Sequence, residues 1–538
     1  MPASSPKWWQ SAVIYQIYPR SFQDTNHDGV GDLAGIRRRL PHLVELGVDA
    51  LWLSPIFPSP MADFGYDITD YVDIDPAFGT LAEFDSLLAA AHRVGIKVIL
   101  DLVPNHTSDR HPWFEESRSS RHNRRRDWYI WRDPATDGGP PNNWQSEFGG
   151  GAWEYDAASG QYYFHSFLTQ QPDLNWRNSA VRAALYDVMR FWLRRGVDGF
   201  RVDVIWRLIK DDQFRDNPAN PDWRPGQPAH RAVVPLYTAD RPEVHDVICE
   251  MRRVVDEFPE RLLIGEIYLP VERLVAYYGR NLSGLHLPFN FALLLMPWKA
   301  RPIAKLIDDY EAVLPMGGWP NWVLGNHDRP RVASRIGPEQ ARVAAMLLLT
   351  LRGTPTIYYG DEIGMLQAAI PPQSVRDPVE RNVPGHGLGR DGCRTPMQWD
   401  VGPHAGFSVA EPWLPLGDDH LHNNVENQRA DATSIYQLHR QLIELRRARA
   451  ALRTGRYRPI AATGDVLLFV RELDGDRLLI ALNLGDEPVE VTLANGRLSG
   501  TLLLSTAGDR VGERVVQALD LRGDEGAVIE LAEDVRVA

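Results

Sequence analysis

Four short apolar runs along the chain end in charged or polar side chains. They occupy residues 98–106, 199–205, 262–266 and 322–328. In the run Gly199-Phe-Arg-Val-Asp-Val-Ile205, the alternation of side chains along a β-strand would bring Arg201 and Asp203 to the same face. An ionised carboxylate in a core must be paired or must serve a function. Buried strands that each present charge at the C-terminal end are typical of the active face of a (β/α)₈ barrel.

Helical periodicity alternates with the apolar runs, as expected for parallel βα units. Amphipathic helices are predicted at about 33–46, 81–94, 179–195, 242–257 and 338–351. Further strand-like runs at 12–17, 50–53, 285–290 and 356–359 bring the candidate strands to eight. The count predicts an α/β protein whose main fold is a complete (β/α)₈, or TIM, barrel.

Two changes of pattern divide the chain. Residues 107–175 contain many Trp, Gly, Pro and Asn but no long helical pattern, which favours a small inserted domain after the third strand over a structureless loop. Strand-like runs at 466–470, 477–481, 489–493 and 501–504 predict a separate C-terminal antiparallel β-domain. We therefore expect a barrel domain in two parts, 1–106 and 176–455, with long loops at 206–240 and 366–393, an inserted domain at 107–175 and a C-terminal β-domain at 456–538.

The composition is typical of a folded protein without disulfide bonds. Of the 538 residues, 44% are apolar and 24% are charged. The net charge of −13 argues against binding to nucleic acid or to anionic membranes. Cys249 and Cys393 make no disulfide framework, and neither a signal-peptide pattern nor a membrane-spanning apolar run is visible. These features predict a cytoplasmic location.

A loop rich in acidic residues follows the first predicted strand. Oxygen-bearing side chains occupy every second position, and a glycine follows the third of them. This spacing suits a hard cation, with five candidate ligands: Asp24, Asn26, Asp28, the carbonyl of Val30, and Asp32. The twelfth position is Gly35 and not the glutamate of an EF-hand, so the pattern alone leaves a plain Asx-rich turn equally open.

Three carboxylates, Asp203, Glu266 and Asp328, each stand at or just past the end of a predicted barrel strand. A single carboxylate there could simply cap the following helix. Three of them that converge at one barrel mouth with two histidines and an arginine are harder to explain by structure alone. Their mutual electrostatics would separate their pKa values, so that one could act ionised and another as a proton donor.

Several motifs, taken in order, resemble the signature regions of the α-amylase superfamily of glycoside hydrolases, glycoside hydrolase family 13. They are Trp8-Trp9 with Tyr15-Gln-Ile-Tyr-Pro19, Asp63-Phe-Gly-Tyr-Asp67, Asp101-Leu-Val-Pro-Asn-His106, Gln171-Pro-Asp-Leu-Asn175, Gly199-Phe-Arg-Val-Asp203, Gly265-Glu266, Asn326-His-Asp328 and Arg394-Thr-Pro-Met-Gln-Trp399. The version at 171–175 is similar to the oligo-1,6-glucosidase and α-glucosidase branch. The resemblance covers almost the whole chain and implies the same three-domain architecture.

The resemblance also implies a role for each motif residue. Asp203 resembles the nucleophile of a retaining glycosidase, Glu266 its general acid/base, and Asp328 the residue that stabilises the transition state. A retaining mechanism needs the first two carboxyls about 5–5.5 Å apart. The other matching positions are expected to bind the non-reducing glucose or to support the carboxylates: Asp63, Tyr66, His106, Arg201, His327 and Arg394. The expected activity is that of a retaining exo-acting α-glucosidase.

The linkage preference and the metal are further expectations from the resemblance. At position 204 the chain resembles α-1,6-preferring enzymes in having valine, whereas maltose-preferring enzymes tend to have threonine at this position. The resemblance therefore favours isomaltose-type substrates. The resemblance favours a structural Ca²⁺ or Mg²⁺ at residues 24–32 and no organic cofactor. The alternatives are an α-1,4-preferring α-glucosidase with strong transglucosylation, a sucrose isomerase or other glucosyltransferase, and an inactive relative that acts as a binding module. A short oligosaccharide or glucoside is the expected partner, and no oligomeric state is predicted.

Overall fold

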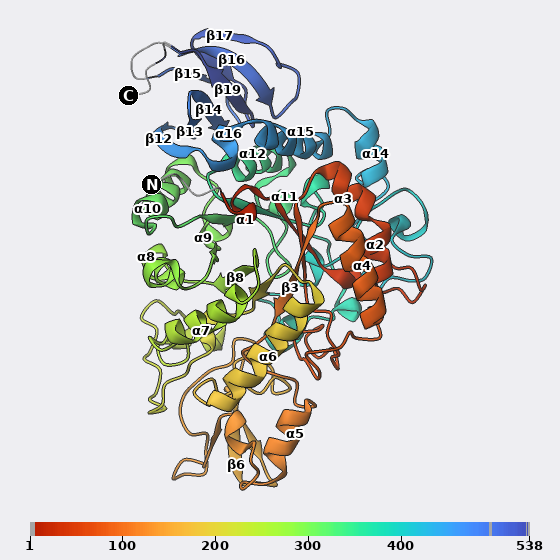
Figure 1. Cartoon of the computed structure of the whole chain (residues 1–538), viewed down its shortest axis with the longest axis vertical. Coiled ribbons are helices and arrows are strands. Elements are labelled where there is room, and N and C mark those ends of the chain that lie inside the picture. The colour runs from red at the N-terminus through yellow and green to blue at the C-terminus, as the bar shows by residue number, and fades with distance from the viewer. Residues whose placement is uncertain (1–5, 494–497, 534, 536–538) are drawn as a thin grey trace.

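The computed structural model describes residues 6–493, 498–533 and 535. Eight parallel strands close into a barrel in the order β1-β11-β10-β9-β8-β7-β3-β2, which confirms the predicted (β/α)₈ fold (Figure 1). The strands are short and almost wholly buried: β1 Ile14–Ile17, β2 Ala50–Leu53, β3 Lys97–Leu102, β7 Gly199–Val202, β8 Leu262–Ile267, β9 Leu287–Asn290, β10 Asn321–Val323 and β11 Thr354–Tyr358. Because β10 ends at Val323, the residues from Asn326 to Asp328 lie in the turn beyond the strand.

Helices cover the outside of the barrel (Figure 1). They are α1 Trp8–Ser11, α2 Leu33–Arg38, α3 Leu40–Leu46, α4 Leu81–Arg93, α6 Ser179–Arg195, α7 Val244–Asp256, α8 Val271–Leu274, α9 Ala292–Leu295, α10 Ala300–Val313, α11 Val332–Ile336, α12 Pro338–Thr350, α13 Pro378–Asn382 and α14 Val425–Ala430. The single helix predicted at 33–46 is wrong, because the chain forms two helices that meet at Arg39. Pro41 occupies the first turn of the second helix, where a missing N–H is tolerated.

The segment between β3 and β7 forms its own small sheet. Strands β4 Trp131–Arg132, β5 Trp153–Asp156 and β6 Gln161–Phe164 pair in the antiparallel order β4-β6-β5, and helix α5 Pro112–Ser119 accompanies them. The ring of Phe114 on α5 stacks on that of Trp131 with 5.7 Å between centroids. In Figure 1 this segment projects from the bottom of the molecule. An isolated bridge between His106 and Asp173 brings its two ends together beside the barrel.

The C-terminal part is an antiparallel β-structure, as predicted. Its main sheet has the order β12-β13-β14-β19-β16-β17, and β15 pairs with β18. The strands are β12 Arg456–Thr463, β13 Val466–Leu473, β14 Asp476–Asn483, β15 Val489–Val491, β16 Leu498–Ser505, β17 Arg514–Gln517, β18 Leu519–Leu521 and β19 Gly526–Leu531. Of these, β12, β17, β18 and β19 are not among the predicted strands. Two helices, α15 Ile435–Ala448 and α16 Ala450–Thr454, lead into the sheet.

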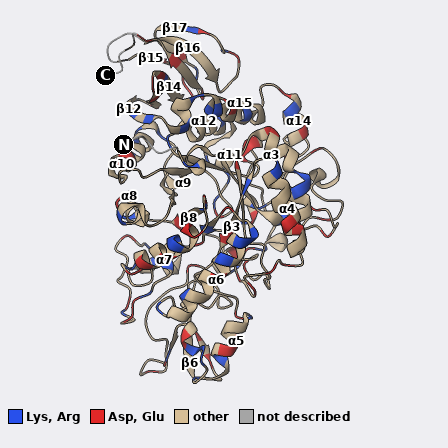
Figure 2. Cartoon of the chain, in the orientation of Figure 1, with Lys and Arg blue, Asp and Glu red and all other residues tan. Residues whose placement is uncertain are grey.

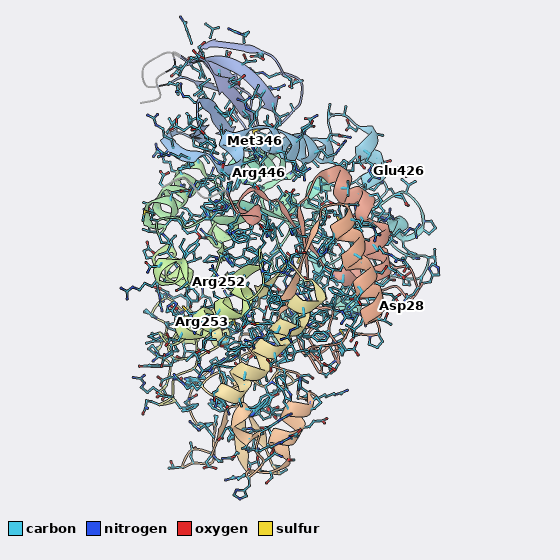
Figure 3. The ribbon with its side chains drawn as sticks, in the orientation of Figure 1. Asp28, Arg252, Arg253, Met346, Glu426 and Arg446 are labelled. Atoms are coloured by element: carbon cyan, nitrogen blue, oxygen red, sulfur yellow. The ribbon has the colours of Figure 1, made fainter. Side chains whose placement is uncertain are left out.

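Buried polar contacts anchor α15 to the barrel. The Arg446 guanidinium donates to the carbonyls of Leu349 and Leu351 at 3.1 and 3.3 Å, at the end of α12. Figure 3 labels Arg446 and Met346 at this junction, between the barrel and the C-terminal strands. Figure 2 shows acidic and basic residues intermixed on the outer helices. Among the described residues, no helix has the length and apolarity needed to cross a membrane.

Candidate active site

A pocket of about 330 Å³ opens at the C-terminal ends of the barrel strands. Residues that follow the strands, the inserted segment and the loop at 366–393 together form its wall. Eight of the predicted site residues line this pocket: Asp63, Tyr66, His106, Asp203, Val204, Glu266, His327 and Asp328. Arg201 and Arg394 do not line it, and both are completely buried while contacting carboxylates of the wall. The structure therefore brings together residues from five separate motifs.

Arg201 is the centre of a charged cluster at this wall. It lies in β7, opposite Asp101 of β3. Its Nη1 atom donates to Asp101 Oδ1 at 2.8 Å and to Asp203 Oδ1 at 2.7 Å. Its Nη2 atom lies 2.8 Å from Glu266 Oε2, without hydrogen-bond geometry. One guanidinium thus holds three carboxyl groups close together, as the alternation in the sequence predicted for Arg201 and Asp203.

The three carboxyl groups share a low-dielectric environment. Burial and then the charge of Glu266 raise the pKa of Asp203 well above its ordinary value, and the Arg201 charge opposes this shift. Burial also raises the pKa of Asp101 to about 6. Buried carboxyl groups this close oppose one another's ionisation, and the Arg201 charge partly offsets this effect for Asp203 and Asp101. An ionised carboxylate beside a protonated one is the arrangement that nucleophile and acid chemistry requires.

Val204 occupies a strained turn and not a strand. Strand β7 ends at Val202, and Val204 has φ 35° and ψ 41° in the left-handed region. Such a backbone is rare for a β-branched residue and costs about 1–3 kcal/mol, so surrounding contacts must maintain it. The turn directs the Val204 N–H to Glu266 Oε2 at 2.8 Å, and it leaves the valine side chain in the pocket wall. The simpler sequence interpretation of Val204 as a strand residue is therefore wrong.

Asp328 lies among donors. Arg394 Nη2 and Arg390 Nη1 donate to its Oδ1 atom at 3.0 and 3.3 Å, and His327 Nε2 lies 3.3 Å from its Oδ2 atom. Burial raises the pKa of Asp328, but His327, Arg390 and Arg394 outweigh burial and keep that pKa below its ordinary value. Asp328 is therefore an ionised carboxylate that faces the pocket.

A chain of hydrogen bonds fixes the ring of His327. Gln16 Nε2 donates to His327 Nδ1 at 2.7 Å, and the opposite ring nitrogen lies 2.7 Å from the Tyr66 hydroxyl. Tyr66 donates in turn to Asp101 Oδ2 at 3.1 Å, and its ring stacks on His327 with 5° between planes. Burial lowers the pKa of His327 well below its ordinary value, so the ring is neutral and carries its proton on Nε2.

Comparison with known proteins agrees with the site. The family described as alpha amylase, catalytic domain, matches residues 16–455. The chain is an α-amylase-family glycoside hydrolase. A family described as a domain of unknown function, DUF3459, matches residues 453–528.

The similar proteins of this family include glucosidases. A probable alpha-glucosidase of Rhizobium meliloti (strain 1021) is 45% identical over 508 residues, which cover 91% of this chain and 92% of the relative. An oligo-1,6-glucosidase of Parageobacillus thermoglucosidasius is 39% identical, with 89% of this chain and 91% of the relative covered. The crystal structure of an alpha-glucosyl transfer enzyme, XgtA, has a TM-score of 0.93 at 41% identity, over 98% of this chain and 100% of that one. These relatives support glucosidase activity.

The sequence patterns miss part of the pocket wall of this glycoside hydrolase. The further lining residues are Glu147, Phe148, Phe167, Trp206, Arg207, His230, Arg231, Tyr268, Arg329, Val379, Leu388 and Arg390. Among them, Arg390 joins three carboxylates: its Nη2 atom lies 2.7 Å from both Asp63 and Asp377, and its Nη1 atom contacts Asp328. One sequence signal could have indicated Arg390 as a site residue. It stands four residues before Arg394, in the run Gly389-Arg-Asp-Gly392.

The acidic loop at 24–32 lies outside the pocket, and Figure 3 places Asp28 near α4. Asp24 and Asp28 accept backbone N–H groups of the same loop at 2.8 Å, and Asn26 accepts the Asp28 N–H at 3.1 Å. Asp32 caps α2 by accepting the Gly35 N–H at 2.6 Å. No group of three or more His, Cys, Asp or Glu side chains forms a metal site within the part of the chain that the structure describes. The loop thus closes on its own N–H groups, and a metal there stays a prediction.

Proposed function

We propose that this enzyme is a retaining, exo-acting α-glucosidase that removes glucose from the non-reducing end of short α-glucosides and prefers α-1,6 linkages. The observation that carries the proposal is the shared contact of one guanidinium, Arg201, with Asp203 and Glu266 at the pocket wall. Sharing one guanidinium keeps the two carboxyl groups close. This favours the separation of about 5–5.5 Å in retaining glycosidases over the roughly 6.5–9.5 Å of inverting ones.

Asp203 and Glu266 have different roles in the reaction. Asp203 attacks the anomeric carbon while Glu266 donates a proton to the glycosidic oxygen, so the aglycone leaves as an alcohol and glucose stays esterified to Asp203. Glu266, now ionised, removes a proton from a water molecule, which attacks the same carbon. Glucose leaves, Asp203 is again a carboxylate and Glu266 again holds its proton. Two successive inversions retain the α configuration.

The charged end of the pocket supports exo action. The bond from Arg390 Nη2 to Asp63 Oδ1, 2.7 Å long, connects the loop after β2 to the loop at 366–393, beside Asp328. A bridge at this point leaves room for a terminal glucose and opposes passage of a longer chain. Burial lowers the pKa of His106 to about 4, so at neutral pH this histidine is an uncharged residue of the same pocket wall.

Product chromatography tests this proposal. The enzyme is incubated separately with equal concentrations of isomaltose, maltose and sucrose, and products are followed over time. We expect free glucose to appear fastest from isomaltose. No glucose from any of the three would contradict the proposed activity, and faster release from maltose would contradict the linkage preference.

Val204→Thr is expected to lower the ratio of kcat/KM for isomaltose over maltose by about tenfold, because one methyl-for-hydroxyl change in a pocket wall shifts discrimination by only a small energy. Steady-state kinetics on both disaccharides measures the ratio. The matched control is Val379→Thr, which makes the same change elsewhere in the wall and is expected to leave the ratio unchanged. An unaltered ratio in the Val204 variant would show that linkage preference is set elsewhere.

Glucosyl transfer is the second candidate function. Here a sugar hydroxyl replaces water in the second step, and the same two carboxyl groups serve. The similar structure described as an alpha-glucosyl transfer enzyme supports this candidate. In the chromatography, new oligosaccharides, or isomerised sucrose in place of glucose, would favour transfer over hydrolysis.

We also propose that Ca²⁺ or Mg²⁺ stabilises the loop at 24–32. Added Ca²⁺ at 100 times its dissociation constant would then increase the free energy of unfolding by about 2.7 kcal/mol, which raises the melting temperature. Differential scanning calorimetry with calcium and with a chelator measures the effect, and Asp28→Asn is expected to reduce it. Identical melting temperatures in calcium and in chelator would leave the loop as a self-contained Asx-rich turn.

A further inference from the structure

Arginines stand among the carboxylates of the pocket wall, in a protein of net negative charge. The chain has a net charge of −13, yet four arginines line this pocket: Arg207, Arg231, Arg329 and Arg390. Arg390 is paired with Asp63 and Asp377, and Arg207 is paired with Glu147 at 2.6 Å. By contrast, neither Arg231 nor Arg329 has a carboxylate within 4 Å among the side chains that the structure describes. Two pocket cations are thus left without an ion pair.

Arg329 lies in the pocket wall beside Tyr268. Its guanidinium is 5.3 Å from the ring centroid of Tyr268, two residues after the proposed acid Glu266. Tyr268 is held in place by the ring of Phe291, which stacks on it with 4.5 Å between centroids. The Nε atom of Arg329 is buried and has no hydrogen-bond partner. A buried donor without an acceptor is unusual, and a bound ligand can supply the acceptor.

Arg231 stands at the mouth of the same pocket. It belongs to a short 3₁₀ turn, Ala229–Ala232, in the long loop at 206–240, and it is exposed. Its neighbour His230 also lines the pocket and has a buried Nδ1 atom without a partner. The nearby carboxylate Glu147 is already engaged by Arg207. The mouth therefore offers unpaired donors to whatever is attached to the terminal glucose.

We propose that the leaving-group side of the pocket binds an oxyanion, a carboxylate or a phosphate, carried by the aglycone. The substrates would then include α-glucosides of anionic alcohols. This inference rests on the proposed glucosidase function, because it takes Glu266 as the residue that faces the leaving oxygen. Guanidinium groups bind oxyanions through paired N–H donors, and Arg329 and Arg231 are the pocket arginines without an ion pair among the described side chains. The negative charges of Asp203 and Asp328 require such an anion to sit beyond the leaving oxygen.

Three α-glucosides with the same three-carbon aglycone test the proposal. Glucosylglycerol is neutral, glucosylglycerate carries a carboxylate, and glucosylglycerol phosphate carries a phosphate. We expect kcat/KM for at least one anionic glucoside to exceed that for the neutral one by about tenfold, and the two anionic arms identify the preferred group. Half-molar NaCl is expected to reduce this preference, because salt screens charges at an open mouth.

Substitutions assign the preference to the two arginines. Arg329→Gln is expected to bring the anionic-to-neutral ratio close to one, Arg329→Lys to keep part of it, and Arg231→Gln to reduce it. The matched control is Arg224→Gln, which removes the same charge from the same loop outside the pocket and should keep the ratio of the parent enzyme. If Arg329→Gln fails to fold, the exposed Arg231→Gln carries the test.

Isomaltose hydrolysis is measured in the same experiment. Hydrolysis of isomaltose with an anionic-to-neutral ratio of one or less overturns this inference and leaves the proposed glucosidase intact. If the ratio of kcat/KM for the anionic over the neutral glucoside stays at the parent value in both Arg329→Gln and Arg231→Gln, the inference is also overturned. Failure to hydrolyse isomaltose and all three glucosides overturns the proposed function, and this inference with it.

Discussion

Asp203→Asn is expected to reduce kcat on isomaltose by about 10⁴-fold or more, because removal of a nucleophile removes the covalent route altogether. Asparagine has nearly the same shape as aspartate and can still accept the N–H of Arg201, which lies 2.7 Å from the native carboxylate. The loss should therefore appear in kcat without loss of the fold. Steady-state kinetics together with circular dichroism measures both.

The stability of this variant provides a second readout. Burial and the Glu266 charge raise the pKa of Asp203 in the folded protein. The free energy of unfolding therefore falls as the pH rises from the pKa of this carboxyl group in the unfolded chain to its pKa in the folded protein. Asparagine carries no such charge, so we expect the melting temperature of the variant to equal or exceed that of the parent at pH 7, with a smaller gain at pH 4. The control Asp187→Asn, on the surface of α6 and 77% exposed, should change neither rate nor stability appreciably. Retention of more than a tenth of the parent activity by folded Asp203→Asn would contradict the nucleophile assignment.

Glu266→Gln is expected to separate the two steps of the reaction. On isomaltose, whose leaving group needs a proton, the rate should fall by about 10²–10⁴-fold. With α-glucosyl fluoride, whose leaving group needs none, Asp203 should still be glucosylated, and the ester should accumulate because no base activates water. Mass spectrometry of the intact protein would detect one added glucosyl unit, and azide should release it as α-glucosyl azide.

The exposed Glu272→Gln on α8 controls for the loss of a carboxylate and should behave like the parent enzyme. Ordinary turnover of isomaltose by Glu266→Gln would contradict its assignment as the acid and base.

The barrel could be predicted from the sequence because each strand is a short apolar run that is bounded by polar or turn residues. Gly199 to Val202 and Leu262 to Ile267 are buried along their whole length, so hydrophobicity alone marks them. Local signals also fixed several helix ends: Asn178 caps α6 at its start, and Gly196 ends it in a left-handed conformation. Strand β17 carried a weaker signal, since its short and mostly exposed run at 514–517 forms a strand through pairing with β16.

A contact within the site could be predicted from residue spacing where one motif holds both partners. Asp203 directly follows β7, two residues after Arg201, so their contact followed from the period of a strand. The approach of Arg390 to Asp63 joins residues 327 positions apart, through a long loop whose path no local pattern encodes. The left-handed turn at Val204 was equally hidden, because valine gives no sequence sign of a positive φ.

The central claim is that Asp203 and Glu266 hydrolyse an α-glucoside with retention of configuration. Proton NMR during the first minutes of isomaltose hydrolysis tests it most directly, because α- and β-glucose have distinct anomeric signals and interconvert slowly enough to be followed. We predict that the glucose released from the non-reducing end appears first as the α-anomer and only later equilibrates. The reducing-end glucose is released with the anomeric ratio of isomaltose itself. Initial β-glucose in excess of that contribution would contradict the double displacement and the roles given to both carboxyl groups.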